Sequence, residues 1–214
     1  MRYDAASPLA RHLAEHTRAL IAFHDQLPRL ERWGAHLADV FDAGGRLLAA
    51  GNGGSAAEAQ HLTSELVGRF RDERRPLSAL SLHAESSTVT AILNDYGGAE
   101  VFARQVRAHG RPGDVLVLLS TSGHSRNVLT AADAAREDGL TVWALTGPGP
   151  NPLLERVHDA VCVDAASTAA IQELHLVGVH VLCAAVDAAL GVTAPETTDV
   201  TDVTDVTDVA EVRA

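Results

Sequence analysis

"RLLAAGNGGSAAEAQHLTSEL", residues 46–66, decides the fold class, because it passes from a strand through a turn into a helix. The continuous apolar run 47–50 is typical of a strand that is covered on both faces. The glycine-rich segment 51–54 allows a tight turn, and a helix is predicted over about 55–67. A strand that leads directly into a helix is the repeating unit of a parallel α/β sheet.

The same alternation continues along the chain. "DVLVLLSTSGHS", residues 114–125, is the strongest strand prediction, an apolar run that stops at a Ser/Thr/Gly loop. The other predicted strands are 77–82, 141–146 and 158–164, and the other predicted helices are 8–26, one from Pro28 onward, 86–95, 100–109, 125–138 and 168–190. We therefore predict an α/β three-layer sandwich with a mainly parallel five-stranded sheet, flavodoxin-like, preceded by two N-terminal helices.

Composition excludes several classes of protein. The formal charge is −11 and no basic patch stands out, which argues against a nucleic-acid partner. All 17 basic residues are arginines, so a lysine Schiff base and a Walker-type phosphate loop are both excluded. Cys162 and Cys183 are predicted to be buried free thiols in a reducing compartment. With no N-terminal signal core and no run interpreted as crossing a membrane, we expect a cytoplasmic protein without a membrane partner.

The chain is predicted to form one domain over residues 1–193, including the N-terminal helices. The remaining segment, 194–214, repeats Thr-Asp-Val four times after Thr197. This low-complexity acidic tail has few residues that could form a core, and we predict that it is disordered.

Two turns are the leading candidates for a ligand site, because ligands of open α/β sheets bind at the carboxyl ends of strands. The first turn offers glycine backbone for close approach and the amino end of a helix, which favours phosphate. Both turns also carry hydroxyls. Hydroxyls and amides without lysine suit a sugar phosphate, whereas the alternative is a pair of tight turns with capping serines. The candidate residues are Gly51, Asn52, Gly53, Gly54 and Ser55 in the first turn and Ser120, Thr121, Ser122 and Ser125 in the second.

Two further groups of polar residues could carry chemistry. His61 and Glu65 lie four residues apart and share one helix face, so they can bind one metal ion, act as an acid/base pair, or make a simple surface contact. Gln172 and His180 interrupt an otherwise apolar helix and can share a broad face. A polar group in such a helix needs a partner, because burying it unpaired costs about 1–3 kcal/mol. We interpret His175 as structural.

Together these stretches resemble the phosphoheptose isomerases, enzymes of the sugar-isomerase (SIS) fold that act on sedoheptulose 7-phosphate. The resemblance covers about residues 5–190, and its most specific part is the combination of His61, Glu65, Gln172 and His180. It implies a homotetramer with a site at subunit interfaces. It also implies one zinc ion per subunit, bound by these four residues. The sugar-phosphate contacts that it implies are Asn52, Gly53, Gly54, Ser55, Glu65, Arg69, Asn94, Asp95, Ser120, Thr121, Ser122, Ser125 and Gln172.

The sequence departs from the family pattern at two places. His124 stands where the serine loop of the family commonly has Asn, and Ala169-Ala170 replaces an acidic and a basic residue. The acidic residue of the family lies near its site, so the loss of that residue bears on the choice of substrate or on the rate.

Isomerisation of a ketose to an aldose moves a proton from C1 to C2 through an enediol. We expect Glu65 to act as the base at C1 and His180 as its acid/base partner, either on the oxygens or in the return to C2. Three alternatives stay open: a non-catalytic SIS protein that binds a replication initiator, a sugar-phosphate sensor, and an isomerase of another ketose phosphate in secondary metabolism.

Overall fold

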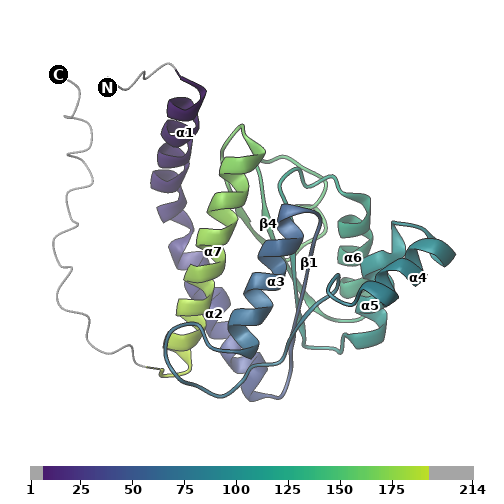
Figure 1. Cartoon of the computed structure of the whole chain (residues 1–214). Helices are drawn as coiled ribbons and strands as arrows, with labels where there is room; N and C mark the ends of the chain where they lie inside the picture. Colours follow the sequence, from purple (N-terminus) through teal and green to yellow (C-terminus); the bar gives the residue numbers. More distant parts are fainter. Residues whose placement is uncertain (1–6, 193–214) are drawn as a thin grey trace, which may run out of the picture.

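The computed structural model describes residues 7–192, which form a five-stranded sheet with helices on both faces (Figure 1). All four strand pairings are parallel, and the strand order is β2-β1-β3-β4-β5. The strands are β1 (Leu47–Gly51), β2 (Ala79–Ser81), β3 (Val115–Ser120), β4 (Thr141–Thr146) and β5 (Asp159–Cys162). The helices are α1 (Pro8–Phe23), α2 (Leu27–Asp42), α3 (Gly54–Val67), α4 (Ser86–Tyr96), α5 (Glu100–His109), α6 (Arg126–Glu137) and α7 (Thr168–Ala189), with a short 3-10 helix at His24–Gln26.

Each face of the sheet has its own apolar core, because successive strand residues point to opposite faces. Leu47 and Ala49 of β1 join the core beneath α1, α2, α3 and α7. Leu48 and Ala50 of the same strand join the core beneath α4, α5 and α6. The central strands are therefore apolar throughout, as the sequence indicated.

The final helix, α7, is central to the first of these cores. It packs against α2, α3 and α1, and half of its most apolar stretch is buried inside the protein. By length and composition alone α7 could cross a membrane, a criterion that the core helix of a folded domain also meets. Its packing is that of the core helix of a folded domain. The aromatic pair Trp33 and Trp143, stacked at 4.5 Å between ring centroids, adds to the same core.

The predicted fold class is confirmed, and the predicted strands and helices are all present with ends that shift by a few residues. Ser7 caps α1 through its hydroxyl, and proline occupies the first turn of both N-terminal helices. The sheet was predicted to be mainly parallel, and all of its strand pairings are parallel. The predicted tail, 194–214, lies outside the described residues, and so its predicted disorder and the domain boundary at 193 stay predictions.

The two cysteines are free thiols, as predicted. Cys183 is buried, whereas Cys162 is only half-buried, so its predicted burial was wrong. Burial raises the pKa of the Cys183 thiol to about 12, and the carboxylates of Glu65 and Asp187 add to the shift. At pH 8 the thiolate is therefore scarce as well as covered. We expect Cys183, isolated in a Cys162→Ala variant, to resist an aromatic disulfide reagent in the native state and to react fully in urea. Native labelling at the rate of the unfolded chain would contradict this burial.

Candidate functional site

The two predicted ligand turns lie side by side at the carboxyl edge of the sheet. β1 and β3 are neighbours, and Gly51 at the end of one strand pairs with Leu119 at the end of the other. Gly53 has φ +56° and immediately precedes α3, while Gly123 has φ +64° in the serine turn. These left-handed conformations favour glycine. At both turns the backbone can therefore bend sharply into the helix that follows. The two helix amino ends therefore face one region, as a phosphate site requires.

The hydroxyls of the second turn differ in their roles. Ser120 is buried, and its Oγ accepts a hydrogen bond from the backbone N–H of Gly123, which shapes the turn. Ser122 Oγ accepts from the N–H of His124 in a similar way. Ser125 occupies the N-cap of α6 without a side-chain capping bond among the described residues, so its hydroxyl is available to a ligand. These serines therefore do more than cap helices, because two of them shape the turn and the third has a hydroxyl available to a ligand.

Gln172 reaches the first turn from α7. A Cβ added at Gly54 would lie 2.6 Å from Nε2 and 2.7 Å from Oε1 of Gln172, so the absence of a side chain at Gly54 is what admits this amide. Gln172 therefore lies at the candidate phosphate site, which agrees with its predicted role as a substrate contact.

The structure brings His61, Glu65 and His180 together from α3 and α7. Nε2 of His61 lies 2.9 Å from Nε2 of His180 and 3.2 Å from Oε1 of Glu65. One ligand atom from each residue fits within 4.8 Å of the others, and all three side chains are half-buried. Two imidazoles and a carboxylate with room for a further ligand are a donor set that suits catalytic zinc. The same three groups can also move protons.

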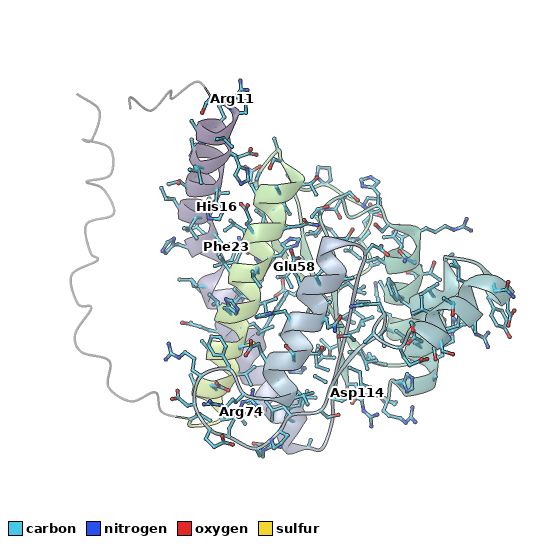
Figure 2. All side chains as sticks on the ribbon, in the orientation of Figure 1. Arg11, His16, Phe23, Glu58, Arg74 and Asp114 are labelled. Carbon is cyan, nitrogen blue, oxygen red and sulfur yellow. The ribbon has the colours of Figure 1, made fainter. Side chains whose placement is uncertain are left out.

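Contacts between α3 and α7 occur at four successive levels. Gly54 meets Gln172, Glu58 faces His175, and His61 meets His180. At the fourth level Arg74 donates to a carboxylate oxygen of Asp187 and to the carbonyls of Glu65 and Leu66. Residue numbers rise together on both helices, so α3 and α7 run in the same direction. Figure 2 shows Glu58 between these helices and Arg74 near their far end.

The second level contains the polar residues that the sequence analysis missed or set aside. His175 is completely buried, and its Nδ1 lies 3.8 Å from Oε2 of the buried Glu58. Both atoms lack a hydrogen-bond partner among residues 7–192. A buried acid/base pair between two site helices could have been suspected from Glu58, which precedes His61 by one helical turn on the same helix.

Among residues 7–192, no hydrogen bond joins three predicted substrate contacts, Arg69, Asn94 and Asp95, to this cluster. Among residues 7–192 their hydrogen bonds are local: Arg69 donates to the carbonyl of Arg71, and Asn94 donates to Oδ1 of Asp95. All three side chains are exposed, with Asn94 and Asp95 on α4. Their roles stay predictions.

One histidine near the first turn does not supply positive charge. The pKa of His83 is lowered because burial disfavours the charged ring, and the backbone of Ala56 offsets this effect only in part. At neutral pH the ring is therefore neutral. His83 therefore adds no positive charge to phosphate binding at this edge.

Comparison with known proteins identifies the family of the chain. The SIS domain model matches residues 12–147. A phosphoheptose isomerase from Streptomyces coelicolor is 63% identical over 183 residues, covering 86% of this chain and 79% of that protein. One from Thiobacillus denitrificans is 51% identical over 166 residues, covering 76% and 84%. The solved phosphoheptose isomerase GmhA from Neisseria gonorrhoeae is 41% identical, with a TM-score of 0.77 over 84% of this chain and 97% of that one.

A second solved phosphoheptose isomerase, from Francisella tularensis, is 34% identical with a TM-score of 0.81, over 87% of this chain and all of that one. Sequence, fold and the clustered histidines and carboxylate therefore lead to the same assignment. The chain belongs to the phosphoheptose isomerase family of SIS-domain proteins.

Proposed function

We propose that this protein interconverts sedoheptulose 7-phosphate and D-glycero-D-manno-heptose 7-phosphate. The observation that carries the proposal is the meeting of Glu65 and His180, from two helices, in a chain that also carries the paired ligand turns at one edge of its sheet. The names of the relatives give the substrate class. A protein that only binds a replication initiator has no need for this carboxylate–imidazole arrangement.

The chemistry assigned to the chain is a proton transfer beside a carbonyl. The Glu65 carboxylate takes a proton from C1 of the ketose, the C1–H electron pair forms the C1–C2 double bond, and the C2 carbonyl becomes an enediol oxygen. His180 gives a proton to that oxygen and takes one from the oxygen on C1. Return of a proton to C2 completes the aldose. Each positioned transfer of this kind contributes about 10²–10⁴-fold in rate.

We also propose that zinc is the bound metal, held by His61, Glu65 and His180, with Gln172 as the predicted fourth ligand. Bound there, the ion supplies Lewis-acid stabilisation of the developing oxyanion. Gln172 precedes His180 by eight residues, about 12 Å along a helix at 1.5 Å per residue. Within one chain the Gln172 amide lies at the Gly54 turn, and it would hold the ion only if the assembled protein brought it to the three other ligands.

Zinc content tests this ligand set. We expect wild-type protein, purified without chelator, to hold about one zinc ion per subunit and His61→Ala to hold much less, because removal of one of three ligands weakens the site. Ser64→Ala, an exposed residue on the same helix, serves as the control. Equal zinc in the His61→Ala and wild-type proteins would show that His61 is not a ligand.

A homotetramer in the cytoplasm completes the proposal. Leu9, Leu13 and Ile21 of α1 are 78%, 57% and 51% exposed, and such apolar side chains favour burial against another subunit. The contacts proposed for Arg69, Asn94 and Asp95 would then come from neighbouring subunits. Light scattering of the purified protein should give four times the mass of one chain.

The direct test of function is conversion of sedoheptulose 7-phosphate by the purified protein, followed beside other ketose phosphates. We expect the seven-carbon substrate to have the highest kcat/KM. Preference for another ketose phosphate would move the protein to a different pathway, as the departures at His124 and Ala169-Ala170 allow. Absence of turnover on all of them, together with a bound replication initiator, would favour the non-catalytic alternative.

A further inference from the structure

A pair of side-chain amides joins the two ligand turns. Nδ2 of Asn52 donates to Oδ1 of Asn127 at 2.9 Å, and Nδ2 of Asn127 donates to Oδ1 of Asn52 at 2.8 Å. Asn52 belongs to the glycine turn after β1, whereas Asn127 lies in the first turn of α6, directly after the serine turn. The two residues are 75 positions apart in the chain, so this contact exists only in the folded protein.

A third hydrogen bond sets the orientation of both amides. Two amides that bond reciprocally could exchange their nitrogen and oxygen positions together without losing either bond. The backbone N–H of Val128 donates to Oδ1 of Asn127 at 3.0 Å as well as to the carbonyl of Ser125, which favours oxygen over an amide N–H at that position. Nδ2 of Asn52 must then face this oxygen. The second N–H of Asn52 remains as a donor of fixed direction.

We propose that Asn127 is a positioning residue for sugar-phosphate binding, acting through Asn52. It holds the Asn52 amide in one orientation and keeps the glycine turn at a fixed separation from the serine turn. Donors from both turns are thereby arranged before the ligand arrives, which lowers the ordering cost of binding. This inference rests on the proposed function, because Asn52 and both turns are its predicted sugar-phosphate contacts.

A positioning role predicts different effects on KM and on kcat. The amide N–H of Asn127 donates to Asn52, and its oxygen accepts from Val128. Removal of this side chain should therefore weaken substrate binding more than it slows proton transfer. Glu65 lies about three helical turns along α3 from the glycine turn, and His180 lies about two turns along α7 from Gln172, so both should keep their geometry. The expected signature is therefore a raised KM with a nearly unchanged kcat.

A double-mutant cycle tests the proposal, with Asn52→Ala, Asn127→Ala and the double variant compared with wild type. Asn127→Ala should raise KM for sedoheptulose 7-phosphate about tenfold, as expected for the loss of two net hydrogen bonds. In the Asn52→Ala background the same change should raise KM less than about twofold. Thr130→Ala is the control, since its hydroxyl bonds only the carbonyl of Arg126 one turn earlier on the same helix.

Two results would overturn the proposal: a KM for Asn127→Ala within twofold of wild type, or an equal effect of Asn127→Ala in both backgrounds. Melting temperatures distinguish a loss of stability from a loss of positioning. We expect Asn127→Ala and Thr130→Ala to have the same melting temperature. If wild type fails to convert the substrate, the proposed function fails, and calorimetric titration with inorganic phosphate decides the positioning role alone. Weaker phosphate binding in Asn127→Ala that depends on Asn52 supports it, and equal binding in all four proteins rejects it.

Discussion

Glu65→Gln is expected to lower kcat for sedoheptulose 7-phosphate by about 10²–10⁴-fold, the range that one positioned proton transfer contributes. Glutamine has the same shape as glutamate, but its amide cannot accept the proton from C1. Binding of the sugar phosphate should change only a few-fold, because the glycine and serine turns are untouched. The measurement is steady-state kinetics combined with direct titration of substrate binding.

Zinc content has to be measured in the same samples, because Glu65 is also a predicted metal ligand. Glu155→Gln, at an exposed position in the segment before β5, makes the same chemical change outside the cluster and should retain full activity. A Glu65→Gln protein that keeps its zinc and retains kcat within tenfold of wild type would remove Glu65 from the role of base. His180→Gln, tested in the same way, examines its partner.

The second large effect is expected for Arg74→Met, which should lower the free energy of unfolding by about 3–5 kcal/mol. Arg74 and Asp187 are 9% and 6% exposed, and Nε of the arginine lies 2.7 Å from Oδ1 of the aspartate. Removal of the guanidinium leaves the Asp187 carboxylate buried and unpaired. It also removes the guanidinium donor to the carbonyl of Glu65 and one of two donors to the carbonyl of Leu66, which still accepts from the N–H of Leu77. Urea unfolding followed by circular dichroism measures the change.

Arg75→Met is the matched control. Arg75 pairs with Asp42 at the surface, where the two side chains are 50% and 67% exposed, so its loss should cost less than about 1 kcal/mol. An Arg74→Met/Asp187→Leu double variant should recover much of the lost stability, because apolar side chains can replace a buried ion pair. Equal stability losses for Arg74→Met and Arg75→Met would contradict the difference in burial on which the prediction depends.

The same buried pair bears on activity. Because Arg74 holds the carbonyl of Glu65 against the end of α7, the positions of Glu65 and His180 relative to each other depend on it. The Arg74 network and the Glu58–His175 level both lie between α3 and α7, whereas the reacting groups lie between these two levels. The buried polar contacts thus fix how one site helix is placed against the other.

The sequence by itself determined the local structure. Continuous apolar runs identified β1, β3 and β4, and glycine at the ends of two strands placed the turns that could bind phosphate. A spacing of four residues was enough to place His61 and Glu65 on one face of α3, because a helix repeats every 3.6 residues. Such features depend on neighbours along the chain, and periodicity reveals them.

Tertiary structure decided which of these parts meet. His61 and His180 are 119 positions apart, and Asn52 and Asn127 are 75 apart, so no local period relates them. Their contacts follow from the packing of α3 against α7 and from the adjacency of β1 and β3 in the sheet. Glu58 was overlooked and its contact with His175 was not foreseen for the same reason, because the burial that brings them together arises only when the two helices pack against each other. Helix and strand patterns specify faces, whereas the packing of those faces specifies a site.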